Sequence, residues 1–300
     1  MPEQYPIVIT GASSGIGRAA AFRLARQNRP LILLCRDNAK ARATHAEILR
    51  LTGNPLVELV TADLAVQADI RAAAAAIRAR HPALGGLVNN AGVSLPDRRL
   101  SPDGIEMHFA VNHLAPFLLT NLLLEPLRAG APSRILTISS DFQRPLRLDD
   151  LDRRKSFDAG EVYGETKLAN VLFTFELARR LSGSRVTANA LAPGFLRTAL
   201  MRDARLTTRF LFALMSVFMM ESAEKGGDRI VHLMTAPELA GTTGEFFVKT
   251  QPGKASAPAY DKALAAQLWA ISERLTGLVP EAVERPDRPR RPFPPVANAP

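Results

Sequence analysis

Two side chains near the middle of the chain have the types and the spacing needed for proton transfer. Tyr163 and Lys167 stand four residues apart in VYGETKLAN, and the segment that follows, VLFTFELARRL, has helical apolar spacing. Residues four apart on a helix share one face. A free tyrosine titrates near about 10, and an adjacent cation lowers that pKa. Such a tyrosine can exchange a proton with an alcohol or carbonyl oxygen during hydride transfer, although most such pairs are ordinary surface residues.

Other polar residues favour the chemical interpretation of this pair. Ser139 and Ser140 end the apolar run SRILTIS, which has the composition of a buried strand. Asn112 interrupts an apolar helical stretch, MHFAVNHLAPFLL. A polar side chain in an apolar stripe needs a hydrogen-bond partner. We therefore expect Asn112 to break the helix locally and to hold a water molecule next to Lys167.

A glycine cluster, TGASSGIG, follows the first apolar run and precedes a helical segment. Glycine at such a turn lets the backbone approach a phosphate, and the helix N-terminus supplies free N–H groups. The spacing G-x-x-x-G-x-G differs from the common G-x-G-x-x-G, and a tight turn without a ligand would also need glycine. The place between strand and helix favours dinucleotide binding. The predicted contacts are Gly11, Ser13, Ser14, Gly15, Ile16 and Gly17.

The ends of the second and third strands bear on which dinucleotide binds. Arg36 and Asp37 follow Cys35, where an arginine would bind a 2′-phosphate and an acid the 2′-hydroxyl. Because Arg36 comes first, NADP(H) is preferred over NAD(H); the alternative is that Arg36 is an exposed loop residue. Asp63, with Leu64 beside it, is expected at the adenine amino group, unless it caps the next helix.

Another turn, VNNAG, follows the fourth strand. Asn90 suits a tight turn, and Ala91 and Gly92 leave space for a flat ring, so these three residues are predicted cofactor contacts. Taken alone, the motif would be only a turn.

The elements that must position these residues alternate along the chain. Apolar runs with the character of strands occupy residues 5–10, 30–35, 56–61, 85–89, 133–139, 186–191 and 243–250. Helical patterns lie between them, which predicts an α/β fold: a doubly wound parallel sheet of the Rossmann type. One domain is expected over residues 1–283. The Pro- and Arg-rich residues 284–300 are predicted to be a disordered tail, with a polyproline ligand as the alternative.

Composition narrows the class of protein. The net charge of +9 is scattered, and aromatic residues are only 6%, so a nucleic-acid partner is not expected. A single cysteine excludes a disulfide within the chain, and the five histidines lack metal-ligand spacing. We see no secretory signal, and the longest apolar run, residues 210–220, is shorter than the roughly 20 residues of a membrane span. A cytoplasmic protein is expected.

The motifs TGASSGIG, NNAG, VNHLAPF, ISS, YGETK and APGFLRT occur in an order that resembles the short-chain dehydrogenase/reductase family over about residues 5–250. LCRD and ETKLANVLFTFELARRL are most similar to its retinol-dehydrogenase-like branch. The resemblance implies Tyr163 as general acid/base and Lys167 as the residue that lowers its pKa and binds the nicotinamide ribose. It also implies Ser140 at the substrate oxygen and Asn112 in a proton relay.

The same resemblance implies a place for the segment after the sixth strand and for the substrate. Pro193, Gly194 and Thr198 match the segment beside the nicotinamide carboxamide. The Met- and Phe-rich residues 198–222 match a substrate lid, which suits a lipophilic alcohol, aldehyde or ketone. A core helix, a dimer contact or shallow membrane docking would also explain this run. Members of the family commonly form homodimers or homotetramers, and we expect pairing through the helices at 103–129 and 161–182.

The sequence departs from the family pattern at two points, and two other functions would be compatible with the same fold. Thr166 stands where many members have serine, and the N-terminal membrane segment of the animal retinoid enzymes is not recognised, so membrane contact is not expected. A catalytically silent sensor or scaffold would keep the fold but lose a catalytic residue. A light-dependent protochlorophyllide-type reductase would use a cysteine in the site, whereas Cys35 lies far from the hydride in this interpretation.

Overall fold

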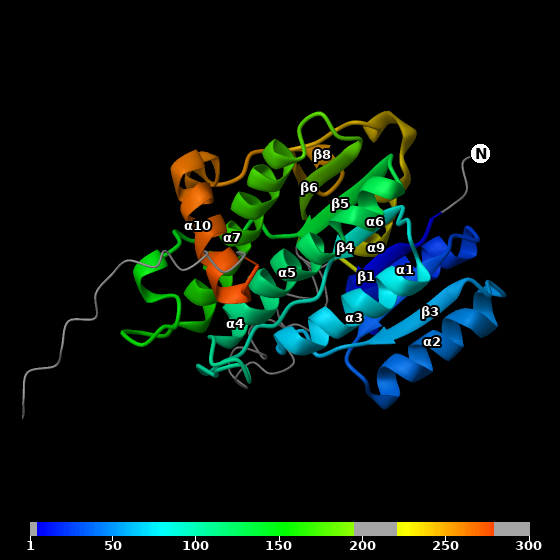
Figure 1. The fold of residues 1–300 in the computed structure, drawn as a ribbon, viewed down its shortest axis with the longest axis horizontal. Helices are drawn as coiled ribbons and strands as arrows, with labels where there is room; N and C mark the ends of the chain where they lie inside the picture. The colour runs from blue at the N-terminus through cyan, green and yellow to red at the C-terminus, as the bar shows by residue number, and fades with distance from the viewer. Residues whose placement is uncertain (1–4, 195–220, 279–300) are drawn as a thin grey trace, which may run out of the picture.

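One eight-stranded sheet forms the centre of the structure, a computed structural model that describes residues 5–194 and 221–278 (Figure 1). The strand order is β3-β2-β1-β4-β5-β6-β7-β8, with parallel pairing from β3 through β7. The strands are β1 (Ile7–Thr10), β2 (Leu31–Cys35), β3 (Val57–Thr61), β4 (Gly86–Asn89), β5 (Ser133–Ile138), β6 (Val186–Ala192), β7 (Phe246–Val248) and β8 (Gln251–Pro252). The winding reverses between β1 and β4, and ligands of open α/β sheets bind at the carboxyl ends beside such a reversal.

Helices cover both faces of this sheet. The longer ones are α1 (Gly15–Arg26), α2 (Ala39–Thr52), α3 (Gln67–Arg80), α5 (Ala115–Leu122), α6 (Leu124–Ala129), α7 (Ala159–Arg180), α9 (Ala223–Thr235) and α10 (Lys262–Thr276). Short elements are α4 (Met107–Phe109), the π-helical turn η1 (Ala110–Leu114) and the 3-10 turns η2 (Leu148–Asp150), η4 (Pro237–Leu239) and η5 (Ala257–Tyr260).

Alternation along the strands explains the two layers. Ile7 and Ile9 of β1 belong to a buried cluster with α1, α2 and α9, whereas Val8 belongs to a cluster with α3, α5 and α7. Successive strand residues point to opposite faces, so a strand buried on both sides must be apolar throughout. The doubly wound parallel sheet predicted from the sequence is confirmed.

Two features of the fold were not anticipated. The last strand, β8, runs antiparallel to β7 as a short hairpin. Helix α10 follows it and lies against α7 at the end of the molecule away from β3 (Figure 1). The Asp261 carboxylate accepts hydrogen bonds from the first turn of α10, and Gly277 at φ 61° ends the helix. Both are standard helix-boundary signals, so this helix was readable in the sequence.

Helix α10 covers part of the surface that the sequence analysis assigned to subunit pairing. Its Trp269 ring lies 4.9 Å from the Phe117 ring of α5 and 5.9 Å from the Phe173 ring of α7, measured between centroids. Homo-oligomer formation therefore remains a prediction, and pairing through α5 and α7 must proceed beside or around this helix.

Several expectations fall on residues that the structure does not describe. They concern most of the predicted lid at 198–222, Thr198 and the tail at 284–300. Within residues 5–194 and 221–278, no helix combines the length and the apolar character required to cross a bilayer.

Candidate active site

The glycine cluster forms a tight turn between β1 and α1. Gly11 and Gly15 adopt φ values of +67° and +54°, which side chains other than glycine rarely take. A Cβ on Gly11 would lie 2.9 Å from the Ala91 Cα, and one on Gly17 would collide with the Asn90 amide. Ser14 precedes α1 without a side-chain capping bond. The turn therefore offers close backbone approach and uncapped N–H groups, both of which suit a diphosphate.

Asn90 braces this turn from the neighbouring strand. Its Nδ2 donates to the Thr10 carbonyl at 2.8 Å, and Thr10 Oγ1 accepts from the backbone N–H groups of Asn90 and Ala91 at 2.9 and 3.0 Å. The predicted cofactor contact Asn90 thus has a structural role that its motif did not reveal: it joins the turns after β1 and β4.

Arg36 and Asp63 line one cavity of about 540 Å³ at the carboxyl ends of β2 and β3. The other lining residues are Asp37, Asn38, Thr61, Ala62 and Asp69. Arg36 is exposed and makes no hydrogen bond or ion pair within the described chain, whereas Asp37 forms an ion pair with Arg42. Arg36 is therefore a cation without a partner among the described residues, and the neighbouring acid is engaged with Arg42.

The residues after the third strand line the same cavity and are fixed by hydrogen bonds to one another. Asp63 Oδ1 accepts from the Ala65 N–H at 3.0 Å, and an Asp69 oxygen accepts from the Asp63 N–H at 3.2 Å. Helix α3 begins later, after Val66, so Asp63 is not its N-cap. Leu64 is buried in the core, which leaves only its backbone to face a cofactor.

Tyr163 and Lys167 lie on α7 with the Lys167 Nζ 5.2 Å from the Tyr163 ring centroid. Lys167 is 5% exposed, and its Nζ donates to the Ile138 carbonyl at the end of β5 at 3.2 Å. Burial lowers the pKa of Lys167 to about 8. Within the described residues, the Tyr163 hydroxyl makes no hydrogen bond.

The expected lowering of the tyrosine pKa is not found in the protein alone. Burial raises the pKa of Tyr163 above its ordinary value, because desolvation disfavours the charged phenolate. Tyr163 therefore keeps its proton at neutral pH, which makes it an acid toward an oxygen placed beside it.

Asn112 sits within η1, where the expected local break of the helix takes the form of a π-helical turn. Its Oδ1 accepts from the Val93 N–H at 2.7 Å, and its Nδ2 donates to the Val93 carbonyl at 3.0 Å and to Thr166 Oγ1 at 3.1 Å. Thr166 Oγ1 in turn donates to the Tyr163 carbonyl at 2.7 Å. These bonds use both protons of the Asn112 amide, so its side chain has no further hydrogen to donate.

Gly92 explains how these groups come together. A Cβ at this position would lie 3.3 Å from Asn112 Oδ1 and 3.9 Å from Lys167 Nζ. The turn after β4 therefore passes directly between the asparagine and the lysine, and glycine keeps that space open.

The two serines at the end of β5 have different roles. Ser139 is buried, and its hydroxyl donates to the Lys167 carbonyl at 2.7 Å, which fixes the strand end to α7. The Ser140 hydroxyl is half-buried and accepts from the Phe142 N–H at 3.1 Å, so its own proton stays available. Sequence reasoning selected Ser140 for the substrate oxygen but missed the bracing bond of Ser139.

The segment after β6 is held by a pair of charged residues that sequence reasoning also missed. The buried Arg229 guanidinium donates to the Pro193 carbonyl and pairs with Glu221 at 2.6 Å. Gly194 follows at φ +80°, and Lys249 lies 3.7 Å from Glu221. No periodic pattern marks Arg229, because its partners lie outside its own helix, eight residues away at Glu221 and 36 residues away at Pro193.

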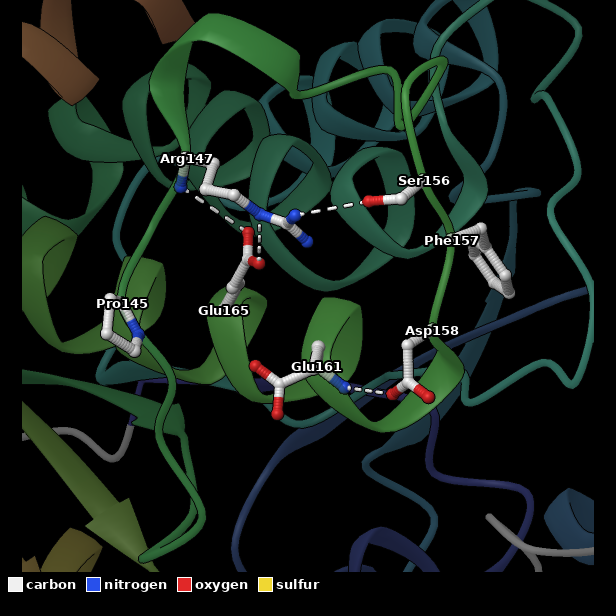
Figure 2. A pocket seen from close by; sticks show the side chains of 7 residues that line it. All are labelled: Pro145, Arg147, Ser156, Phe157, Asp158, Glu161 and Glu165. Carbon is white, nitrogen blue, oxygen red and sulfur yellow. Dashed lines mark hydrogen bonds and ion pairs between the residues drawn. The ribbon is translucent and has the colours of Figure 1, made fainter.

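A second cavity, of about 420 Å³, lies between α7 and the β5–α7 connection (Figure 2). Glu161 and Glu165 line it, together with Pro145, Arg147, Ser156, Phe157 and Asp158. These glutamates are two residues from Tyr163 on either side, so they occupy the opposite helix face at about 100° per residue. Glu165 pairs with Arg147 at 3.1 Å and with Arg153, which holds the connection against α7.

His108, His113 and Cys35 have surroundings that indicate a role in the fold. His108 Nδ1 lies 2.7 Å from Glu106, and its Nε2 accepts from the Leu95 N–H at 2.9 Å. His113 is buried, with Ser272 Oγ 2.9 Å from its Nε2, and burial lowers its pKa to about 3. Cys35 is buried at the end of β2, where burial raises its thiol pKa.

The chain resembles known proteins along most of its length. Residues 6–209 match the model of a family described as short chain dehydrogenase. Human retinol dehydrogenase 14 is 37% identical over 290 residues, which cover 91% of this chain and 86% of that protein. Human retinol dehydrogenase 13 is 41% identical over 292 residues, covering 95% and 88%.

Solved structures agree with this similarity. A putative uncharacterized protein from Mycobacterium paratuberculosis superposes with a TM-score of 0.74 at 32% identity, covering 91% of this chain and 94% of the other. A short chain dehydrogenase from Burkholderia cenocepacia J2315, solved in complex with NADP, gives a TM-score of 0.65 at 25% identity and covers 81% and 94%.

Proposed function

We infer the function from one premise: this chain belongs to the short-chain dehydrogenase/reductase family, in its retinol-dehydrogenase-like branch, and is an oxidoreductase. We propose that it transfers a hydride between NADP(H) and a lipophilic alcohol/aldehyde or ketone pair. The observation that carries this proposal is the convergence of Lys167, Asn112 and Gly92 beside Tyr163, with Ser139 bonded to the Lys167 carbonyl.

Each catalytic group has a role that follows from its surroundings. Tyr163, protonated at neutral pH, gives its proton to the substrate oxygen in the reductive direction. Ser140 donates a hydrogen bond to the same oxygen, and Lys167 supplies a positive charge and a donor for the nicotinamide ribose. When bound, the dinucleotide supplies the hydride.

The residues present fit a dinucleotide. The turn after β1 gives the backbone approach that a diphosphate needs, and the cavity at β2 and β3 gives room for the adenosine. The unpaired Arg36, beside an Asp37 that is paired with Arg42, supports NADP(H) over NAD(H), because a guanidinium binds a phosphate with two parallel hydrogen bonds. NADP in the Burkholderia relative is consistent with this preference.

The substrate class rests on the family and on the apolar lid predicted at residues 198–222. The retinol dehydrogenases that this chain resembles are named for a lipophilic alcohol, which supports a substrate of this class. Buried Cys35 does not favour a photochemical role.

The cofactor assignment is tested by replacing Arg36 with alanine. Loss of a charge-assisted phosphate contact costs about 1.5–3 kcal/mol, so NADPH should bind roughly 10- to 150-fold more weakly, whereas NADH binding should change little. Fluorescence titration gives both dissociation constants, and turnover of a carbonyl and alcohol panel gives the matching rates.

Arg50→Ala is the matched control, because Arg50 is an exposed arginine on α2 that does not line the cavity. A wild-type enzyme that uses NADH as fast as NADPH, or equal losses for both cofactors in Arg36→Ala, would contradict the assignment.

A further inference from the structure

The side chain of Gln143 joins two distant parts of the chain beside Ser140. Its Nε2 donates to the Ser140 carbonyl at 2.9 Å. Its Oε1 accepts from both the N–H and the hydroxyl of Ser256, at 3.1 and 2.8 Å. Gln143 is only 8% exposed and its bonds are partly buried, so its amide would lose partners that water replaces only in part if these bonds were broken.

On one side of this amide lies the turn that presents the Ser140 hydroxyl. The Phe142 N–H donates to Ser140 Oγ, and the Gln143 N–H donates to the Asp141 carbonyl at 3.1 Å. These bonds shape the turn from within. The Gln143 side chain bonds to the Ser140 carbonyl and to Ser256, and so connects the turn to a distant part of the chain.

On the other side lies the segment from Gly253 to Tyr260, which follows the β7–β8 hairpin. The Gly253 N–H donates to the Phe246 carbonyl at 2.8 Å, and the Tyr260 ring packs against Phe175 of α7 at 5.5 Å. The segment is thus anchored to the sheet at one end and to α7 at the other. Between these anchors, its bond to the Ser140 turn is made through Ser256.

We propose that Gln143 is a positioning and specificity-determining residue, which fixes Ser140 and holds residues 253–260 as a wall beside the substrate. The proposal deepens the proposed function and rests on it. Substrates long enough to reach past Ser140 contact this wall, whereas short ones contact only the catalytic groups. Gln143 therefore contributes to the rate with every substrate and to the preference for long ones.

The test is Gln143→Met, which keeps the length of the side chain and removes its hydrogen bonds. Two readouts are compared with wild type: amide hydrogen exchange of Ser256, and kcat/KM for decanal and butanal with NADPH. We expect the Ser256 amide to exchange at least about tenfold faster, because the bond that protects it is lost. We expect kcat to fall roughly fivefold for both aldehydes, and the decanal-to-butanal ratio of kcat/KM to fall by a similar factor.

Gln67→Met is the matched control. The Gln67 side chain also bonds to the C-terminal region, at the Leu275 carbonyl at 3.0 Å, but it lies on α3. This variant should keep both the exchange rate of Ser256 and the aldehyde ratio. If Gln143→Met only reduced the amount of active protein, the apparent kcat/KM would fall by the same factor for both aldehydes. An unchanged decanal-to-butanal ratio would therefore overturn the specificity role.

Failure of the proposed function can be told apart from failure of the proposed role of Gln143. If the wild-type protein binds NADPH but reduces neither aldehyde nor any other carbonyl, the proposed function fails, and the Ser256 exchange rate alone still decides whether Gln143 tethers the segment. If Gln143→Met does not fold, Ser256→Ala removes only the hydroxyl donor. It should lower the aldehyde ratio about twofold, and an unchanged ratio would overturn the proposal.

Discussion

Lys167 carries its charge in a largely buried place, where it is only 5% exposed. Its pKa falls from 10.5 to about 8 because burial disfavours the ammonium. Between those two values, the unfolded chain binds more protons than the folded one, so the free energy of unfolding rises with pH across this window. The contribution is fully present above about 10.5 and is lost as the pH falls through about 8.

Lys167→Met should remove this pH dependence. At roughly 1.4 kcal/mol per pH unit, the shift from 10.5 to about 8 corresponds to about 3 kcal/mol between the ends of the window. Urea unfolding of both proteins at pH 7.5 and 10.5 measures it. The free energy of unfolding of the wild type minus that of the variant should rise by an amount of this order between pH 7.5 and 10.5. The same difference at both pH values would show that the folded lysine keeps an ordinary pKa.

At the residue scale, the sequence singled out candidate side chains but did not reveal what they contact. Tyr163, Lys167, Ser140 and Asn112 were selected because their types and order are distinctive. Their hydrogen bonds were not, since partners such as the Ile138 carbonyl belong to distant parts of the chain. The raised pKa of Tyr163 was missed for the same reason: burial cannot be read from a neighbour four residues away.

Among the elements, α7 and the connection that precedes it set the distance between Ser140 and Tyr163. The Arg144 N–H donates to the Gly164 carbonyl at 3.2 Å, next to Tyr163. A Cβ on Gly164 would lie 2.7 Å from the Arg144 Cγ and 3.1 Å from the Phe142 ring. Glycine at this position therefore lets the connection carrying Ser140 approach the helix.

Gly164→Ala should lower activity more than stability. The added methyl group pushes the connection away, so kcat should fall about five- to tenfold, as expected when a reacting group is displaced slightly. Helix propensity favours alanine over glycine by about 1 kcal/mol, which offsets much of the steric cost in the unfolding free energy. Steady-state kinetics and thermal melting measure the two effects.

Gly160→Ala is the control in the same helix, because its Cβ would meet only the Asp158 carboxylate, at 3.3 Å. This variant should keep its kcat. A Gly164→Ala enzyme as active as Gly160→Ala would show that the approach of the connection does not position Ser140.

The strands were the most predictable elements, because a strand buried on both sides must be apolar along its whole length. Each of the seven predicted runs overlaps one of the seven parallel strands, although β6 extends one residue past its run, to Ala192, and β7 spans only Phe246–Val248 of the predicted 243–250. Helix α10 escaped prediction even though Asp261 and Gly277 mark its ends. The residues that its Trp269 packs against, Phe117 and Phe173, lie far away in the sequence, so the position of this helix could not be inferred from its own residues.

Across the whole molecule, α10 joins the C-terminal region to the helices that carry the site. The Trp269 ring is 5% exposed, contacts Phe117 and Phe173, and lies under the Arg180 guanidinium at 4.1 Å. Aromatic contacts of this kind stabilise a protein beyond the area they bury. The C-terminal helix is therefore part of the core rather than an appendage.

Trp269→Ala should destabilise the protein by about 3–5 kcal/mol, the usual cost of removing a large buried ring. Urea unfolding followed by far-UV circular dichroism measures it, which avoids reliance on the only tryptophan. Leu275→Ala, an exposed position on the same helix, should cost far less. Equal effects of the two substitutions would show that α10 is only loosely attached.

The central claim is that Tyr163 delivers the proton in a hydride transfer between NADP(H) and a carbonyl or alcohol. The most direct test is the turnover of Tyr163→Phe on the carbonyl and alcohol panel, with NADPH binding measured in parallel. Removing the hydroxyl should lower kcat by about 10²-fold or more, because general acid catalysis is lost. The dissociation constant of NADPH should stay within about twofold, because Lys167 and the glycine turn remain. A variant that turns over at the wild-type rate would contradict the account.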